Sequence, residues 1–275
     1  MSTINCKGTL IDLSTPKVMG IVNVTPDSFF DGGKLTNSDE IVVQVEKMLQ
    51  DGATFIDLGG YSSKPGAEFV SETEELNRVV PIVKLLVEKF PDILLSIDTF
   101  RSEVAKQTVE NGVAIINDIS AGLLDEKMLE TVAKLQVPYI MMHMKGTPKT
   151  MQSLAQYEDL VKEMNFYFSE RIAKARTFGL NDIIIDPGFG FAKTIEHNYE
   201  LLQNLELLQF HDLPILAGIS RKSMIYKTLE TSLEDALNGT TFLHAFCLQK
   251  GSNILRVHDV KEAVECVKLM CRLGN

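Results

Sequence analysis

The chain has 275 residues, of which 45% are hydrophobic and 23% charged, so it can bury a core of ordinary size. Its formal net charge of −10 argues against partners such as nucleic acid or an anionic membrane. No apolar run approaches the ~18 residues of a membrane span, and the start of the chain lacks the pattern of a secretory signal. We therefore expect a cytoplasmic protein with small-molecule substrates. The four cysteines show no CxxC spacing and are expected to be buried thiols rather than a zinc site.

Strand-like and helix-like patterns alternate along nearly the whole chain. An extra strand or hairpin is expected over residues 3–13. Apolar runs typical of buried parallel strands then follow over 18–23, 54–58, 93–98, 113–117, 138–143, 183–186, 214–218 and 253–257. Helical periodicity lies between them, and one helix begins with a capping box, Ser71 to Glu74. These patterns predict an α/β fold, a (β/α)₈ TIM barrel forming one domain over residues 1–275.

Six of the predicted strands end in polar residues that a barrel core does not require. These are Asn23, Asp98, Asn117, His143, Asp186, and the pair Arg256 and His258. An unpaired polar group buried in this way costs several kcal/mol, on the order of known burial penalties. Because the carboxyl ends of barrel strands share one face, the pattern indicates a common site and an enzyme. Carboxylates and amides at 98, 117 and 186 suit a flat heterocycle, since a carboxylate such as Asp186 can accept two parallel N–H donors.

Two connections on the same face are unusually long. Residues 24–37 and 59–71 both follow strands, and loops beyond about 12 residues inside a compact domain are usually functional or disordered. Phe29 and Phe30 are unusual in a merely solvated loop. We interpret both segments as lids over the site.

A cationic cluster is expected beside the ring of carboxylates and amides. The seventh strand runs into Ser220, Arg221, Lys222 and Ser223, and the eighth ends in Arg256-Val-His258-Asp259. Barrels commonly hold phosphate in these two loops. Asp259 is expected to N-cap the following helix, whose free N–H groups attract anions.

Three further polar residues are ambiguous. Asn23 is a modest metal ligand, and magnesium bound there would need oxygens from a substrate diphosphate and from water. His143 could act in chemistry or brace a loop. Asp57, inside the second strand, is expected to be a buried structural carboxylate rather than a catalyst.

Several long motifs together resemble the dihydropteroate synthase family over almost the full length. They are the segments 19–33, 96–99, 116–118, 142–152, 186–191, 220–224 and 256–260. The resemblance implies condensation of 6-hydroxymethyl-7,8-dihydropterin diphosphate with 4-aminobenzoate, with release of diphosphate, in folate biosynthesis. It also implies Mg²⁺, a homodimer, and inhibition by sulfonamides.

The resemblance implies a role for each residue that matches a family motif. The pterin would be held by Asp98, Asn117, Asp186 and Lys222, in a pocket lined by Met141 and Phe191. The diphosphate would be held by Arg256 and His258, with Mg²⁺ at Asn23. The aminobenzoate slot would be shaped by Phe29, Ser63, Pro65 and Ser223.

The sequence favours an S_N1-like reaction, because no nucleophile–base pair appears among these residues. The bond to diphosphate would break first as Mg²⁺, Arg256 and His258 neutralise the leaving charge. The ring cation would be stabilised by Asp98, with Asp27 of the first lid, before the arylamine attacks.

One stretch departs from the family pattern. The second lid usually reads Gly-x-Ser-Thr-Arg-Pro-Gly, whereas this chain has Ser63 and Lys64 before Pro65. Lysine keeps the charge but cannot make a planar bidentate contact. We expect retained activity with altered aminobenzoate or sulfonamide affinity, which a Lys64→Arg variant with unchanged kinetics and inhibition would refute. Two alternatives stay open at this point: a folate-dependent methyltransferase and a non-catalytic pterin-binding paralogue.

Overall fold

A computed structural model describes residues 3–24, 36–61, 70–147 and 150–274. Its strands are β1 Thr3–Cys6, β2 Thr9–Asp12, β3 Lys17–Asn23, β4 Phe55–Gly59, β5 Leu95–Asp98, β6 Ile115–Asp118, β7 Tyr139–Met142, β8 Ile183–Asp186, β9 Leu216–Ala217 and β10 Ile254–Val257. Its α-helices are α1 Thr36–Gln50, α2 Glu72–Lys89, α3 Ser102–Glu110, α4 Met128–Leu135, α5 Leu160–Thr177, α6 Ile195–Gln203, α7 Ser223–Tyr226, α8 Leu237–Gln249 and α9 Val260–Arg272. Short 3₁₀ segments lie at η2 Met151–Leu154, η3 Leu205–His211 and η4 Glu234–Ala236.

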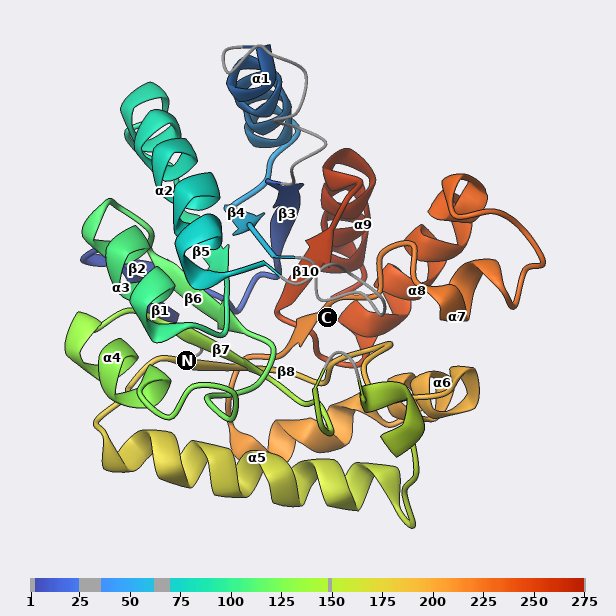
Figure 1. Cartoon of the computed structure of the whole chain (residues 1–275). Coiled ribbons are helices and arrows are strands. Elements are labelled where there is room, and N and C mark those ends of the chain that lie inside the picture. Colours follow the sequence, from blue (N-terminus) through green and yellow to red (C-terminus); the bar gives the residue numbers. More distant parts are fainter. Residues whose placement is uncertain (1–2, 25–35, 62–69, 148–149, 275) are drawn as a thin grey trace.

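The eight-stranded sheet is parallel and has the order β8-β7-β6-β5-β4-β3-β10-β9. Its two edges meet through a parallel bridge between Ile185 and Ile215, beside a 2.9 Å hydrogen bond from Ile185 N to the Pro214 carbonyl. The helices lie outside this ring of strands (Figure 1). The predicted TIM barrel is therefore confirmed.

Successive side chains of each strand alternate between the barrel interior and the helical shell. In β5, Ile97 joins the large cluster packed against the helices. Its neighbours Ser96 and Asp98 therefore face the opposite side, the interior. The same alternation places Asn117, Asp186 and Arg256 inside. The site residues thus come from the interior face of the wall rather than from its packed outer face.

The N-terminal hairpin closes the end of the barrel where the strands begin, opposite the carboxyl ends that carry the site residues. Strands β1 and β2 pair antiparallel around a turn at Lys7 and Gly8, which both have positive φ. Ile4 and Cys6 of β1 pack in one cluster with Phe55 and Ile254 near the starts of their strands. The extra strand or hairpin expected over residues 3–13 is a hairpin that covers the amino end of the barrel.

Several predicted boundaries shift in the structure. The strand expected over 214–218 is only two residues long, because the chain leaves the sheet directly after Ala217. The Ser71 side chain accepts a 3.2 Å hydrogen bond from Glu74 N at the start of α2, but the Glu74 carboxylate pairs with Arg78. Half of the predicted capping box is therefore observed. Among the described helices, none is long and apolar enough to span a membrane.

Candidate active site

Neighbouring strands bring the polar residues together in one register row. Asn23 pairs with Gly59, Gly59 with Asp98, and Asp98 with Asn117, across β3 to β6. A Cβ atom added to Gly59 would lie 3.7 Å from Asn23 Oδ1 and 3.8 Å from Asp98 Cβ. The absence of a side chain at Gly59 therefore leaves space between the amide and the carboxylate. The predicted convergence of Asn23, Asp98 and Asn117 at the carboxyl ends is present.

Asp57 links this row to Arg256. The Arg256 Nε donates to Asp57 Oδ2 at 2.6 Å, and Arg256 Nη2 donates to Asp98 Oδ2 at 2.8 Å. Asn117 Nδ2 donates to the same Asp57 oxygen at 3.0 Å, while Asp57 itself is fully buried. Asp57 is thus structural, as expected, but it orients two of the predicted substrate-binding residues. Sequence reasoning missed this link, although a carboxylate inside a buried strand was its signal.

Burial controls the charge of this network. It raises the pKa of Asp98 to about 7, although the Arg256 cation opposes the shift. Burial also acts to lower the pKa of Arg256, but Asp57 and Asp98 outweigh it and raise that pKa above its ordinary value. Arg256 is therefore a permanent cation, and Asp98 is a carboxyl group that titrates near neutral pH.

Lys222 and Asp186 form a second charged pair of the site. The Lys222 ammonium donates to the Phe189 carbonyl and lies 4.9 Å from the centre of the Phe191 ring. Burial lowers the pKa of Lys222 to about 8, while the nearby Asp186 opposes the shift. Burial likewise raises the pKa of Asp186, and Lys222 counteracts it. The structure therefore brings Asp186, Lys222 and Phe191 together, as predicted.

A buried lysine that the sequence reasoning missed holds residues 187–191, which we call the β8 strap. Lys193 Nζ donates to the Gly188 and Phe191 carbonyls, at 3.1 Å each, and lies 3.0 Å from His143 Nδ1. Burial lowers the pKa of Lys193 to about 7 and that of His143 well below its ordinary value. Of the two roles left open for His143, loop bracing is the one its contacts support.

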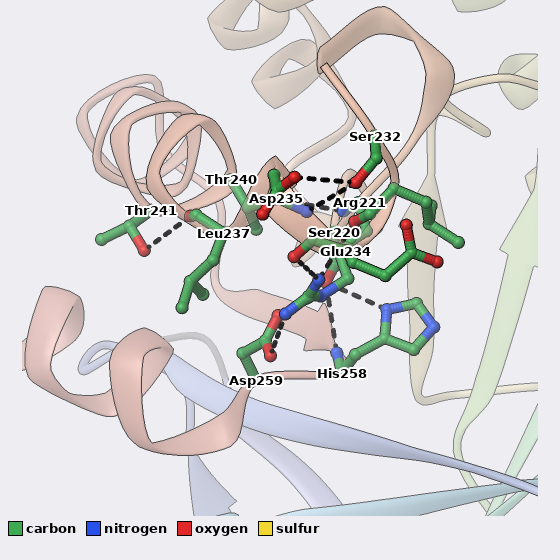
Figure 2. A network of polar contacts seen from close by, with 11 residues as sticks. Ser220, Arg221, Ser232, Glu234, Asp235, Leu237, Thr240, Thr241, His258 and Asp259 are labelled. Carbon is green, nitrogen blue, oxygen red and sulfur yellow. Dashed lines mark hydrogen bonds and ion pairs between the residues drawn. The ribbon is translucent and has the colours of Figure 1, made fainter. Parts of the chain in front are cut away.

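Ser220, Arg256 and His258 form what we call the anion corner. Ser220 Oγ lies 3.0 Å from His258 Nδ1 and accepts a 3.2 Å hydrogen bond from His258 N (Figure 2). Ser223 begins α7 in the same loop. His258 follows directly after β10, two residues beyond Arg256.

Two expectations about the anion corner were wrong. Asp259 occupies the N-cap position of α9, but its carboxylate makes no capping hydrogen bond. It accepts instead from Arg221 Nε and Nη2, at 2.8 Å each. Arg221 is consequently neutralised by Asp259 and does not add to the cationic cluster. A side chain from the loop after the neighbouring strand β9 competes better for this carboxylate than the helix does.

The strand alternation also changes the expected lining of the pocket. Met141 packs in the cluster between the barrel wall and the helices, so it points away from the interior. Met142 and Phe191 share a cluster at the carboxyl end of the barrel. Met142 is therefore the methionine of β7 that faces the site, one residue after the one predicted.

Asn23 is the residue predicted to bind magnesium. Asn23 is exposed at the end of β3, where it offers one neutral amide oxygen of the kind Mg²⁺ prefers. In the described part of the chain, no three His, Cys, Asp or Glu side chains cluster as metal ligands. The lid residues Asp27, Phe29, Ser63, Lys64 and Pro65 lie outside the described residues.

The family model for pterin binding enzymes matches residues 19–258. The chain belongs to the pterin-binding enzyme family. The dihydropteroate synthase of Escherichia coli K12 is 43% identical over 266 residues, covering 96% of this chain and 94% of that relative. The Yersinia pestis dihydropteroate synthase in complex with a sulfonamide drug superposes with a TM-score of 0.92 at 42% identity, and 98% of each chain is covered. The Xanthomonas albilineans dihydropteroate synthase in complex with 7,8-dihydropteroate superposes with a TM-score of 0.87 at 37% identity, again with 98% of each chain covered. These pterin-binding enzymes share the barrel described above.

Proposed function

We propose that this chain is a dihydropteroate synthase. As a transferase, it joins 6-hydroxymethyl-7,8-dihydropterin diphosphate to 4-aminobenzoate and releases diphosphate in folate biosynthesis. The observation that carries this assignment is the placement of two kinds of group at one end of the barrel. Asp98, Asn117 and Asp186 offer oxygens and an amide to a flat ring, while Arg256 and His258 offer nitrogen donors for an anion.

The ring of the pterin would be bound from the barrel interior. Asp186 would accept two parallel N–H groups of the amino-pyrimidinone edge, and Asn117, fixed by its hydrogen bond to Asp57, would bind another edge. Lys222 would donate to a ring heteroatom from its position beside the β8 strap. We propose Phe191 and Met142 as the apolar surfaces, with Met142 in place of the predicted Met141.

The diphosphate would be bound at the anion corner. Arg256 uses its Nε–H for Asp57 and one Nη2 N–H for Asp98, so Nη1 and the second Nη2 N–H make no hydrogen bond to another described residue. The Ser220 contact engages His258 Nδ1, and we propose that Nε2 donates to the diphosphate. Mg²⁺ held by Asn23 would supply Lewis-acid neutralisation of diphosphate charge when bound.

The reaction follows from this division of charge. Arg256 and His258 stabilise the diphosphate as it takes the electron pair of the C–O bond. The ionised Asp98 stabilises the cation then delocalised over the pterin ring and its methylene carbon. The aminobenzoate nitrogen attacks that carbon and afterwards loses a proton. Asp27, Phe29, Ser63, Lys64, Pro65 and Ser223 retain the lid and slot roles implied by the family resemblance.

The function is tested by a coupled assay for diphosphate in the presence of both substrates and magnesium. Turnover dependent on 4-aminobenzoate, with 7,8-dihydropteroate as product, supports the proposal, and its absence contradicts it. The order of steps is tested separately with the pterin diphosphate alone. Release of diphosphate without the amine supports bond cleavage first, whereas strict dependence of cleavage on the amine overturns it.

We also propose that the protein is a cytoplasmic homodimer. All four cysteines are free thiols, in keeping with a reducing compartment. Phe242 on α8, Leu269 on α9 and Leu273 directly after α9 are exposed apolar side chains, and the two helices pack together, which suits a subunit contact. Light scattering that gives the mass of one chain would contradict the dimer.

A further inference from the structure

An arginine beside the anion corner makes contacts that the proposed chemistry does not use. Arg221 directly follows Ser220 and precedes Lys222, and it adopts the left-handed backbone conformation with φ of 54°. This conformation is unfavourable for a residue with a long side chain. The Arg221 side chain contacts Asp259, whereas Ser220 contacts His258 and Lys222 donates to the Phe189 carbonyl.

Those contacts join three segments that are distant in the sequence. The guanidinium makes a bidentate pair with Asp259, from Nε and Nη2 at 2.8 Å each. Its Nη1 donates to the Leu233 and Glu234 carbonyls at 3.0 and 2.7 Å, and Arg221 N donates to Thr240 Oγ1 at 3.1 Å. Figure 2 shows Arg221 between Asp259 and the segment around Glu234. We call the Arg221–Asp259 pair the clamp.

Each member of the clamp is adjacent to a residue proposed to bind one half of the substrate. Lys222 follows Arg221 and is proposed to hold the pterin. His258 precedes Asp259 and is proposed to hold the diphosphate. The Ser220–His258 contact at 3.0 Å makes a second link between the same two loops. The clamp thus joins the loop after β9 to the loop after β10 at the point where the two halves of the site meet.

The clamp differs from an ordinary surface ion pair in its geometry. The side chains of Arg221 and Asp259 are only 20% and 18% exposed. A bidentate Arg–carboxylate pair fixes the relative orientation of the two groups, which a single lysine contact does not. The two carbonyl contacts remove most of the remaining freedom of the guanidinium. Arg221 is also charge-paired, so it is not available as a binding cation for the substrate.

Building on the proposed function, we propose that Arg221 and Asp259 are positioning residues that set the spacing between Lys222 and His258. Neither touches the substrate. Their effect is to hold the pterin-binding and diphosphate-binding groups at the separation that the intact pterin diphosphate requires. A ligand that spans both groups depends on this spacing, whereas a ligand that occupies one group does not.

This difference gives a direct test. Calorimetry in magnesium buffer would measure three affinities for each protein: for 6-hydroxymethyl-7,8-dihydropterin, for inorganic diphosphate, and for the pterin diphosphate that joins them. In Arg221→Met and in Asp259→Asn, we expect the affinities for the two separate ligands to change less than about twofold. The affinity for the joined ligand should fall about tenfold, because the two sites no longer match the linkage. The double variant should be no worse than either single one.

Other outcomes overturn the clamp proposal in recognisable ways. A loss confined to inorganic diphosphate would show that Arg221 binds the anion itself. Equal losses for all three ligands together with a lower Tm would show only structural support. Arg221→Lys should restore part of the joined-ligand affinity, and it serves with Asp259→Asn if Arg221→Met does not fold.

The matched control is Lys250→Met, which removes a 2.7 Å ion pair with Glu206 at the far end of α8. It should leave all three affinities unchanged. The wild-type protein separates this proposal from the one it rests on. If it fails to bind or turn over the pterin diphosphate, the proposed function fails. If it does both and the variants match it, only the clamp fails.

Discussion

The Arg256 guanidinium donates from Nε to Asp57 at 2.6 Å, so a permanent cation of the site is held by a carboxylate that is itself fully buried. Asp98 accepts from the same guanidinium at 2.8 Å. Asp57 thus supports the substrate-binding groups from inside its strand, whereas Asp98 is itself one of those groups. The pair explains why a strand interior carries Asp57 at all, because an unpaired carboxylate there would be strongly destabilising.

Arg256→Met should destabilise the protein and abolish its activity. It leaves Asp57 buried without its cation, which costs about 3–5 kcal/mol in comparable cases. Adding Asp57→Asn removes the uncompensated charge, so the double variant should recover much of that stability without recovering activity. Urea denaturation and steady-state kinetics measure the two effects. Equal stability of the single and double variants would contradict the pairing.

Lys193→Met should weaken pterin binding without touching the substrate. The variant leaves the Phe191 carbonyl without its donor, at about 1–3 kcal/mol for a buried group left unsatisfied, and the Gly188 carbonyl keeps only its 3.0 Å hydrogen bond from Phe191 N. The β8 strap carries Phe191 and the carbonyl partner of Lys222, so pterin affinity should fall about tenfold when the strap loosens. Lys134→Met, which breaks an exposed pair on α4, is the control. Unchanged calorimetric affinity in Lys193→Met would refute the role.

Gly188→Ala should be far more damaging than Gly8→Ala. Both glycines have positive φ, of 67° and 85°, so both variants pay a backbone penalty of about 1–2 kcal/mol. A Cβ at Gly188 would also lie 2.3 Å from the His143 carbonyl oxygen, whereas one at Gly8 meets nothing within 4 Å. Only Gly188→Ala should therefore displace the β8 strap and reduce pterin binding. A comparable loss of pterin affinity in the two variants would show that the backbone penalty, and not the contact with the His143 carbonyl, causes the effect.

The value of kcat should rise with pH through the titration of Asp98. Burial raises the pKa of this carboxyl to about 7, and stabilising the pterin cation requires the ionised form. In Asp98→Asn the rise of kcat with pH that is due to Asp98 should disappear, while any pH dependence due to the substrate diphosphate persists. If the pH profile of kcat were unchanged in Asp98→Asn, the titrating group would belong to the substrate and not to Asp98.

The raised pKa of Asp98 makes the folding stability decrease with pH, whereas it makes kcat increase with pH. Because the pKa is raised in the folded state, the folded protein retains a proton that the unfolded chain has lost. The contribution of Asp98 to stability therefore falls as the pH rises from 3.8 to about 7. Urea denaturation of wild type and Asp98→Asn across this window measures the difference.

The barrel and the face of the site could be predicted from the sequence because both depend on local pattern. Alternating strand and helix signals predict the repeat, and polar strand ends such as Asp98 and Asp186 locate the site. The partner that each side chain selects depends on contacts distant in sequence. Arg221 and Asp259 are an example, since local rules assign the aspartate to its helix. Lys193 likewise has no local signal, because its acceptors are arranged by the turn after β8. The sequence predicts Met141 instead of Met142 in the pocket, because a shift of one residue in the alternation reverses the face of a strand.

The closure of the barrel between β8 and β9 has a consequence for its motions. A single bridge at Ile185 and Ile215 joins these edges, and β9 is only two residues long. Asp186 directly follows Ile185 on one edge, while the loop that carries Lys222 follows the other. Transient opening between β8 and β9 would separate Asp186 from Lys222, which are both proposed to bind the pterin ring. A bound pterin would therefore stabilise the closed barrel. Amide hydrogen exchange at Ile185 should therefore slow on ligand binding more than exchange within the longer β3–β4 ladder.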